Sequence, residues 1–314
     1  MTSPPLVAIV GPTATGKTAL AVRLAEHFGG EIVNADSRQV YRGMDIGTAK
    51  PSAAELSNAR HHLVDIVDPD EPFSLGSYLD LAHEALDDCW SRGVLPLLTG
   101  GTGQYVWALL EGWQVPRVPP DPELRAALEA QAARDGAESL LRRLDEVDPE
   151  YGARVDRNNL RRVIRALEVF ERTGRPISSC QSREPLDARS AIVGLTCERM
   201  ELYRRIDERV DAMMAAGLLD EARGLVERGY GRELPAMSGI GYRQICQHLS
   251  GELSLEEAVE RIKTETHRLA RMQYTWFRLD DSRIHWLDVA AGDPYAEALR
   301  IVESETGLSG GLQR

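Results

Sequence analysis

The sequence has few cysteines and no long apolar segment. Its 314 residues include only four cysteines, with no Cys-x-x-Cys pair among them: Cys89, Cys180, Cys197 and Cys246. This usage is typical of buried small apolar side chains and argues against a disulfide framework or a zinc site. No apolar stretch approaches the roughly eighteen residues of a membrane-spanning helix, and the first residues lack the regions of a secretory signal. We therefore expect a soluble cytoplasmic protein with no membrane partner.

Basic residues are also scarce relative to acidic ones. Lys and Arg total 37 against 49 Asp and Glu, giving a formal net charge of -12, which argues at first sight against a nucleic-acid partner. The basic residues are unevenly spread, however, because residues 151–176 and 261–278 each carry a local positive excess. The first run contains Arg154, Arg157, Arg161, Arg162, Arg165, Arg172 and Arg175, and the second contains Arg261, Lys263, Arg268, Arg271 and Arg278. Either run alone is also compatible with a solvated helix face.

A phosphate-binding loop is the most informative motif present. It follows the apolar run 6–10, precedes a helical pattern from Ala19 to Phe28, and comprises Gly11, Pro12, Thr13, Ala14, Thr15, Gly16, Lys17 and Thr18. In this pattern the backbone N–H groups and the helix N-terminus bind phosphate oxygens. Lys17 supplies a positive charge, and the Thr18 hydroxyl suits Mg2+. The motif does not say whose phosphates are bound.

The remaining pattern predicts an α/β fold. Apolar runs indicate strands at 7–10, 31–34, 63–67, 94–98, 192–195 and 284–289, and helical periodicity indicates helices at 18–28, 77–90, 122–134, 137–147, 158–173, 199–228 and 255–279. Alternation of the two predicts a P-loop NTPase-like parallel sheet core with helices on both faces. A proline-rich linker near residue 116 opens a stretch that contains helices only. We therefore predict an inserted all-helical domain at 116–190 within a core formed by 1–115 and 191–314.

Two strand ends carry candidate chemistry. The predicted second strand ends in Asn34-Ala-Asp36, and the fourth is followed by Gly100-Gly-Thr-Gly103. In a parallel sheet both segments lie at the same edge as the phosphate loop. Asp36 can face the bound phosphates, although it can also cap the next turn or support a Mg2+ ion. The glycine-rich turn offers more N–H donors and the Thr102 hydroxyl, although it can equally be a tight strand-to-helix turn.

The phosphate loop alone is also compatible with an ATP-dependent kinase of a small molecule or nucleotide. A nucleotide hydrolase places a metal-binding aspartate after an apolar strand. Only residues 63–68 come close to that pattern, and they continue into Pro69 and an acidic loop. An RNA-binding protein with a vestigial loop is a third possibility, disfavoured because Lys17, Thr18, Asp36 and Thr102 are all present.

Several segments together resemble the bacterial tRNA dimethylallyltransferases. They are 11–18, 36–51 (Asp-Ser-Arg-Gln-Val-Tyr-Arg-Gly-Met-Asp-Ile-Gly-Thr-Ala-Lys-Pro), 61–65, 100–103, 161–168, 239–244 and 273–278, so that the similarity extends from residue 7 to about 290. The resemblance implies transfer of the dimethylallyl group from dimethylallyl diphosphate to the exocyclic N6 amine of the adenosine on the 3′ side of the anticodon, position 37. Mg2+ is the implied cofactor, ATP is not used, and the implied partner is the tRNA anticodon stem-loop. We expect a monomer.

The resemblance also assigns residues to roles. Asp36, Thr102 and Lys17 are implied as catalytic, with Asp36 accepting the proton of the amine and Thr102 contacting either that amine or the diphosphate. The diphosphate is expected to bind the loop from Gly11 to Thr18 together with Arg125. Predicted tRNA contacts are Asp36, Ser37, Arg38, Gln39, Gly103, Asn159, Leu160, Arg161, Arg162, Val163, Gly239, Gly241, Tyr242, Arg243, Arg271 and Gln273. With tRNA as the partner, the two basic runs are expected to bind its backbone phosphates.

Overall fold

A computed structural model describes residues 3–308 of the chain. Its centre is a 6-stranded sheet in the order β3-β2-β4-β1-β5-β6, in which every pairing is parallel. The strands are β1 (Pro5–Val10), β2 (Glu31–Asn34), β3 (His61–His62), β4 (Pro96–Thr99), β5 (Arg189–Thr196) and β6 (His285–Asp288). The register pairs Ile9 with Thr99, so the carboxyl ends of β1 and β4 lie side by side. The predicted α/β class with a parallel sheet is confirmed.

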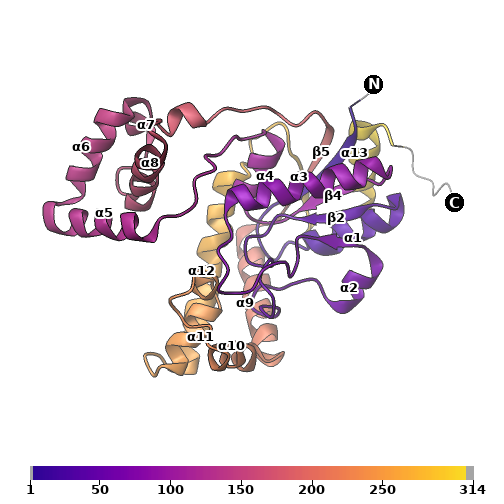
Figure 1. The fold of residues 1–314 in the computed structure, drawn as a ribbon. Coiled ribbons are helices and arrows are strands. Elements are labelled where there is room, and N and C mark those ends of the chain that lie inside the picture. Colours follow the sequence, from indigo (N-terminus) through magenta and orange to yellow (C-terminus); the bar gives the residue numbers. More distant parts are fainter. Residues whose placement is uncertain (1–2, 309–314) are drawn as a thin grey trace. The chain divides into compact units, whose positions relative to one another are not determined.

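Helices cover both faces of this sheet because side chains along each strand alternate between two apolar surfaces. Val7 and Ile9 pack with α1 (Lys17–Phe28) and α13 (Tyr295–Thr306). On the other side of the strands lies α3 (Leu75–Ser91), which contacts β2 and β4 (Figure 1). Two shorter helices, α2 (Ala53–Asn58) and α4 (Gly103–Leu110), follow β2 and β4 in the chain. Among the described residues, none of the helices has the length and apolar character needed to span a bilayer.

A second core lies beyond the carboxyl edge of the sheet. It is built from α9 (Arg199–Ala215), α10 (Leu218–Glu227), α11 (Tyr242–Leu249) and α12 (Leu255–Trp276) (Figure 1). Val40, Tyr41 and Met44, from the long loop after β2, are buried in the same cluster. This loop is thereby anchored to the helices and held next to the strand ends.

The chain divides into two compact units: residues up to Trp107 together with those from Asp187 onward, and the segment Ala108–Leu186. Within its described secondary structure the second unit holds α5 (Pro122–Asp135), α6 (Ala137–Val147), α7 (Pro149–Arg154), α8 (Leu160–Thr173) and a short 3-10 turn. Its own apolar core includes Leu128, Leu140, Leu144 and Leu167. A core of this kind is what an independently packed helical unit requires.

Two of the predicted elements differ from the structure, and some helices were not predicted. The strand predicted at 63–67 is wrong, because Leu63 and Asp65 have φ values of 62° and 55° and turn the chain out of the sheet after His62. The helix predicted at 199–228 is two helices, separated at Gly217, whose φ of 101° ends the first. The helix α7 was missed, although Asp148 caps it and Pro149 begins it, the same local signal that begins α5 at Asp121 and Pro122.

Candidate active site

The phosphate loop joins β1 to α1 at the carboxyl edge of the sheet. Inside the loop, Lys17 Nζ donates to the Pro12 carbonyl at 2.7 Å and Thr15 Oγ1 donates to the same carbonyl at 2.9 Å. The first N–H groups of α1 have no partner within the helix and carry its positive dipole end. They border a pocket of about 310 Å³ lined also by Lys17, Thr18 and Asp36. The arrangement is that of an anion site.

Arg209 on α9 adds a second cation to this pocket, and sequence reasoning missed it. Its Nη1 donates to Thr13 Oγ1 at 3.4 Å. Among the residues that the structure describes, neither Arg209 nor Lys17 forms an ion pair. Burial lowers the pKa of the Lys17 ammonium to about 7, with Arg209 lowering it further and Asp36 opposing the change. Burial likewise lowers the pKa of Arg209. Two partly buried cations held without a carboxylate partner indicate a site built for a multiply charged anion.

Asp36 lies at the end of β2, where a bonded turn holds it. Its Oδ1 accepts the Arg38 N–H at 2.8 Å, and the neighbouring Ser37 N–H donates to Thr102 Oγ1 at 3.0 Å. The Asn34 side chain braces the strand end by donating to the Leu63 carbonyl at 3.0 Å. The second carboxylate oxygen of Asp36 has no hydrogen bond to any described residue. It is therefore available to a ligand.

The glycine-rich turn after β4 packs tightly against α12. A Cβ at Gly103 would lie 2.2 Å from the Cβ of Trp276, so no larger residue fits there. Gln273 joins this turn to the phosphate loop, since its Oε1 accepts the Thr13 N–H at 2.8 Å and its Nε2 donates to the Gly101 carbonyl at 2.9 Å. Both ends of the Gln273 amide are thus used within the protein. The structure gives Gln273 a bracing position, and its predicted tRNA contact stays a prediction.

A larger cleft of about 860 Å³ opens beside the phosphate pocket. Residues that line both spaces are Thr13, Asp36, Thr48, Ala49, Gly101, Arg209 and Gln273. The cleft also contains Thr102, the exposed side chains of Arg261 and Arg268, and an apolar wall that includes Met272 and Trp276. Asp36 consequently lies where a small anion-binding pocket meets a wide, partly basic cleft.

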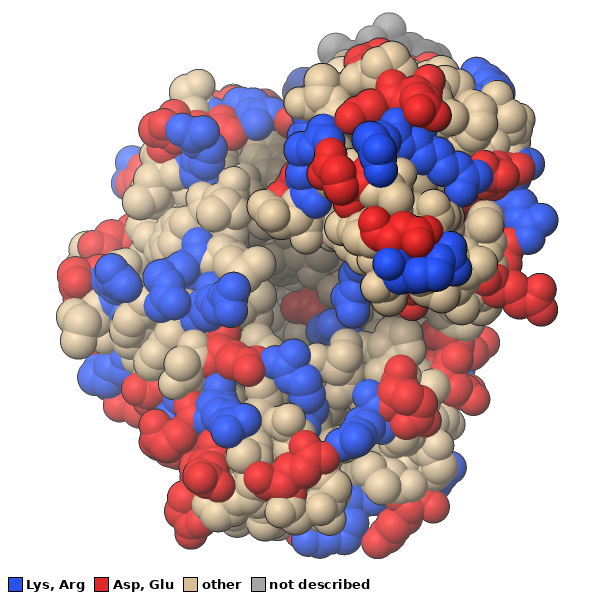
Figure 2. All heavy atoms as spheres, turned by 90° about the vertical axis from the view of Figure 1, so that its left-hand side faces the viewer, with Lys and Arg blue, Asp and Glu red and all other residues tan. Residues whose placement is uncertain are grey.

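Charge on the surface is mixed rather than segregated. Figure 2 shows Lys and Arg side chains interspersed with Asp and Glu over the visible face. Many arginines of the two basic runs are neutralised, for example Arg157 by Asp145, Arg172 by Asp121 and Arg278 by Asp280. Within the described residues, Arg161 and Arg162 at the start of α8, and Arg261 and Arg268 on α12, are exposed without an ion pair. Together with Arg175, which is likewise exposed without an ion pair to a described residue, they are the arginines of the two runs best able to bind phosphate.

Other predicted contacts are distributed as follows. The Arg38 guanidinium donates to the Pro235 carbonyl at 2.7 Å, Arg243 pairs with Glu265, and Arg271 donates to the Tyr203 hydroxyl at 2.6 Å. Asn159 caps α8, which begins at Leu160. Gly239 and Gly241 line the cleft.

Two predicted contacts have buried side chains. Val163 and Tyr242 are 0% and 1% exposed, in two different cores, so RNA would reach only their backbone.

Arg125 lies in the helical unit and has a partner there. Its Nε and Nη2 donate to the two oxygens of Glu168 at 2.7 and 2.8 Å, and Glu168 itself is fully buried. This bidentate pair joins α5 to α8. The predicted diphosphate contact of Arg125 stays a prediction.

One cluster of metal-type ligands lies outside this site, at the amino end of β2. It consists of Glu31, His62 and Cys89. Both oxygens of Glu31 accept hydrogen bonds from Arg92 at 2.7 Å, and His62 Nε2 lies 2.7 Å from Oε2. Burial raises the pKa of the Cys89 thiol to about 11. The thiol is therefore protonated at neutral pH and the cluster is a satisfied structural network.

Comparison with known proteins places this geometry in a family. The IPP transferase family model matches residues 39–280, and an isopentenyl transferase model matches residues 4–67. The chain belongs to the IPP transferase family. It is 60% identical to a tRNA dimethylallyltransferase from Roseiflexus castenholzii over 87% of this chain and 90% of that protein. The family resemblance read from the sequence is thus confirmed.

Solved structures of family members agree with the fold. The full-length tRNA isopentenylpyrophosphate transferase from Bacillus halodurans is 42% identical, with a TM-score of 0.71 over 96% of both chains. A eukaryotic dimethylallyltransferase, described as acting on tRNA, is 27% identical, with a TM-score of 0.82 over 99% of this chain and 82% of that one.

Proposed function

We propose that this IPP transferase family member is a tRNA dimethylallyltransferase. It transfers the dimethylallyl group from dimethylallyl diphosphate to the exocyclic N6 amine of the adenosine at position 37 of tRNA and releases diphosphate. The observation that carries the proposal is the position of Asp36, which lines both the phosphate-loop pocket and the wide cleft. A carboxylate at that junction can reach an amine presented from the cleft to a donor held in the pocket.

The pocket stabilises the departing diphosphate. Breaking the bond between the allylic carbon and oxygen leaves its electron pair on the diphosphate, and preorganised donors aimed at developing charge lower such a barrier. The N–H groups at the start of α1, Lys17 and Arg209 supply those donors. Thr18 fits Mg2+, because its hydroxyl lines the pocket and has no hydrogen bond to any described residue. Mg2+ bound there would supply further neutralisation of the diphosphate.

Asp36 serves the acceptor side of the reaction. The adenine amine is weakly nucleophilic, and a hydrogen bond to the free oxygen of Asp36 increases its electron density. As the nitrogen–carbon bond forms, the amine becomes acidic and its proton passes to the Asp36 carboxylate. The Arg38 N–H and the Ser37–Thr102 contact keep the carboxylate oriented.

The cleft accommodates the tRNA. An adenosine must leave the stack of the anticodon loop before its amine can reach Asp36. Unstacked bases of single-stranded RNA pack against apolar and aromatic side chains, and Met272 and Trp276 provide such a wall. Arg261 and Arg268 stand in the same cleft without ion pairs and bind backbone phosphates.

A kinase reaction is less well supported by the same geometry. Both strands that neighbour β1 end in threonine, β4 in Thr99 and β5 in Thr196, where a nucleotide hydrolase has a metal-binding carboxylate after an apolar strand.

Lys17 leads to a prediction about pH. Its pKa of about 7 in the free protein leaves most of the ammonium deprotonated at pH 8. A bound diphosphate favours the charged form and raises that pKa, so binding at pH 8 takes up a proton, whereas at pH 6 Lys17 is already charged. Calorimetry of dimethylallyl diphosphate binding in two buffers of different ionisation enthalpy measures this uptake. Lys17→Arg is the control, because arginine stays charged; equal proton uptake by this variant would contradict the assignment.

The unpaired arginines of α12 lead to a second prediction. Replacing Arg261 and Arg268 together with Ala should weaken tRNA binding and reduce the slope of log affinity against log salt by about one for each lost phosphate contact. The matched control is Arg278→Ala, since Arg278 belongs to the same basic run but is paired with Asp280. A salt slope unchanged in the double variant would place the phosphate contacts elsewhere.

Identification of the reaction product tests the proposed function. Purified protein is incubated with unmodified tRNA, Mg2+ and dimethylallyl diphosphate, and the tRNA is digested and analysed by mass spectrometry. The expected product is one dimethylallyl group on the adenosine that follows the anticodon. Modification at another position, or of another base, would contradict the proposal.

A further inference from the structure

Residues 37–51, the segment after β2, include Gln39, a predicted tRNA contact, but form no helix and no strand of the sheet. Thr48, Ala49 and Lys50 from this segment line the phosphate pocket together with Gln39. A loop of this length keeps one shape only if its polar groups are bonded within the protein. The question is therefore what holds it.

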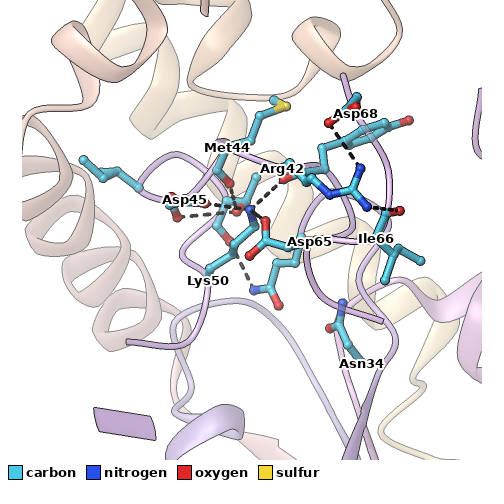
Figure 3. Close-up of polar contacts among 12 residues, drawn as sticks. Asn34, Arg42, Met44, Asp45, Lys50, Asp65, Ile66 and Asp68 are labelled. Carbon is cyan, nitrogen blue, oxygen red and sulfur yellow. Dashed lines mark hydrogen bonds and ion pairs between the residues drawn. The ribbon is translucent and has the colours of Figure 1, made fainter. Parts of the chain in front are cut away.

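Lys50, near the end of the segment, bonds back to earlier residues of it. Its side chain is only 5% exposed, and Nζ donates to the Tyr41 carbonyl at 2.6 Å, to Asp45 Oδ1 at 2.6 Å and to Asp65 Oδ1 (Figure 3). An ammonium group has three donors. All three are consumed, so Lys50 has no hydrogen left for a ligand.

Gln39 is fixed by the residues next to Lys50. Its Nε2 donates to the Thr48 carbonyl at 3.2 Å and to the Ala49 carbonyl at 3.0 Å. Both amide hydrogens are thus used, and only the amide oxygen can bind a ligand. An acceptor distinguishes the amine of adenine from the carbonyl of hypoxanthine or guanine at the same ring position.

The backbone near Lys50 has a conformation that needs such support. Ala49 and Asp65 have φ values of 50° and 55°, in the left-handed region that non-glycine residues seldom occupy. Strained residues of this kind persist where surrounding contacts hold them, and they gather at functional sites. The ion pair to Asp65 and the attachment of Lys50 directly after Ala49 supply that restraint.

The outer side of the segment has its own anchor. The Glu221 carboxylate accepts the N–H groups of Asp45, Ile46 and Gly47 and also the Tyr242 hydroxyl. Gly47 lies against the Tyr242 ring, where an added Cβ would come within 2.6 Å. Because this anchor does not involve Lys50, loss of the Lys50 ammonium should loosen the inner part of the segment and leave the fold intact.

We propose that Lys50 is a positioning residue for base recognition: it holds residues 48 and 49 where their carbonyls orient the Gln39 amide toward the target adenine. The proposal rests on the proposed function. Thr48 and Ala49 line both the phosphate pocket and the cleft, so the Gln39 amide that they hold lies at the border where the base meets the donor. The groups that grip the diphosphate, Lys17 and Arg209, make none of the contacts described for Lys50. Its loss should therefore affect tRNA selection and not donor binding.

The test compares Lys50→Met with wild type. The readouts are the separate KM values for tRNA and for dimethylallyl diphosphate, and the ratio of binding affinities for anticodon stem-loops with adenosine or inosine at position 37. We expect Lys50→Met to raise the tRNA KM and to reduce the adenosine preference by about tenfold, the size of one lost hydrogen bond to a base. The KM for the donor should stay close to the wild-type value, and Lys50→Arg should recover part of the preference.

Arg92→Met is the matched control. Arg92 likewise donates to several acceptors, the Glu31 and Asp88 carboxylates, but it lies outside the segment and lines neither the phosphate pocket nor the cleft. Should Lys50→Met fail to fold, Asp65→Asn and Asp45→Asn each remove one partner that is about half exposed and can be hydrated. An unchanged adenosine preference in a folded variant, or equal increases in both KM values, would overturn the proposal. Absence of transfer by the wild-type protein would instead overturn the proposed function.

Discussion

Asp36→Ala should lower kcat for prenyl transfer by about 10² to 10⁴-fold, the usual contribution of a positioned general base. Binding of dimethylallyl diphosphate should not weaken, because removing a carboxylate from a pocket that holds an anion takes away a like charge. The expected signature is therefore a loss in kcat with an unchanged or lower KM for the donor. Single-turnover transfer to tRNA, together with calorimetric binding of the donor, measures the two effects separately.

Asp36→Asn tests the proton transfer more specifically than Asp36→Ala does. The amide oxygen can still accept the Arg38 N–H that now bonds to Oδ1 at 2.8 Å, so the turn is preserved while the ability to take a proton is lost. We expect Asp36→Asn to be nearly as slow as Asp36→Ala. Near wild-type transfer by Asp36→Asn would show that the proton leaves by another route.

Arg209→Ala should weaken binding of dimethylallyl diphosphate by about 10- to 100-fold, because hydrogen bonds to charged groups contribute about 1.5–3 kcal/mol. Arg209 is partly buried, its pKa is lowered by burial, and it has no ion pair with a described residue. Removing such a group relieves a desolvation cost, so the melting temperature of the free variant should be equal to or higher than that of wild type. Calorimetry with the donor and thermal unfolding measure the two quantities.

Arg205→Ala is the control for this prediction. Arg205 lies one turn earlier on α9 and pairs with Glu201 at 2.7 Å. It lines neither the phosphate pocket nor the cleft, so its loss should leave donor affinity unchanged. The role of Arg209 is contradicted if Arg209→Ala binds the donor as tightly as wild type.

A second consequence is that Arg209→Ala should raise the pKa of Lys17, since Arg209 is one of the causes that lower it.

Sequence patterns predicted the parts of this site that depend on local geometry. The loop from Gly11 to Thr18 and the position of Asp36 after β2 follow from strand–turn–helix rules, because parallel strands bring their carboxyl ends to one edge. Arg209 could not be found in this way. It lies on a helix among other charged residues, and only the packing of α9 beside the phosphate loop gives it a distinct role.

The basic runs show a similar limit. Local charge alone predicted two phosphate-binding stretches, but ion pairs formed by distant residues neutralise several of the arginines, as Asp121 does for Arg172. The strand expected at 63–67 failed for a comparable reason. Its apolar run is real, yet the positive φ values at Leu63 and Asp65 shape a turn beside the Lys50 network instead of a strand. Long-range contacts decided both outcomes, and such contacts have no local signature.

The most direct test of the central claim is transfer of label from dimethylallyl diphosphate to tRNA in the presence of Mg2+, with and without ATP, for wild type and Asp36→Ala. The claim is that the phosphate loop holds a prenyl donor and that Asp36 takes the proton of the acceptor amine. We predict that label enters tRNA equally well without ATP and that Asp36→Ala transfers almost none. Phosphorylation dependent on ATP, without transfer of the prenyl label, would contradict the claim and identify the loop as part of a kinase.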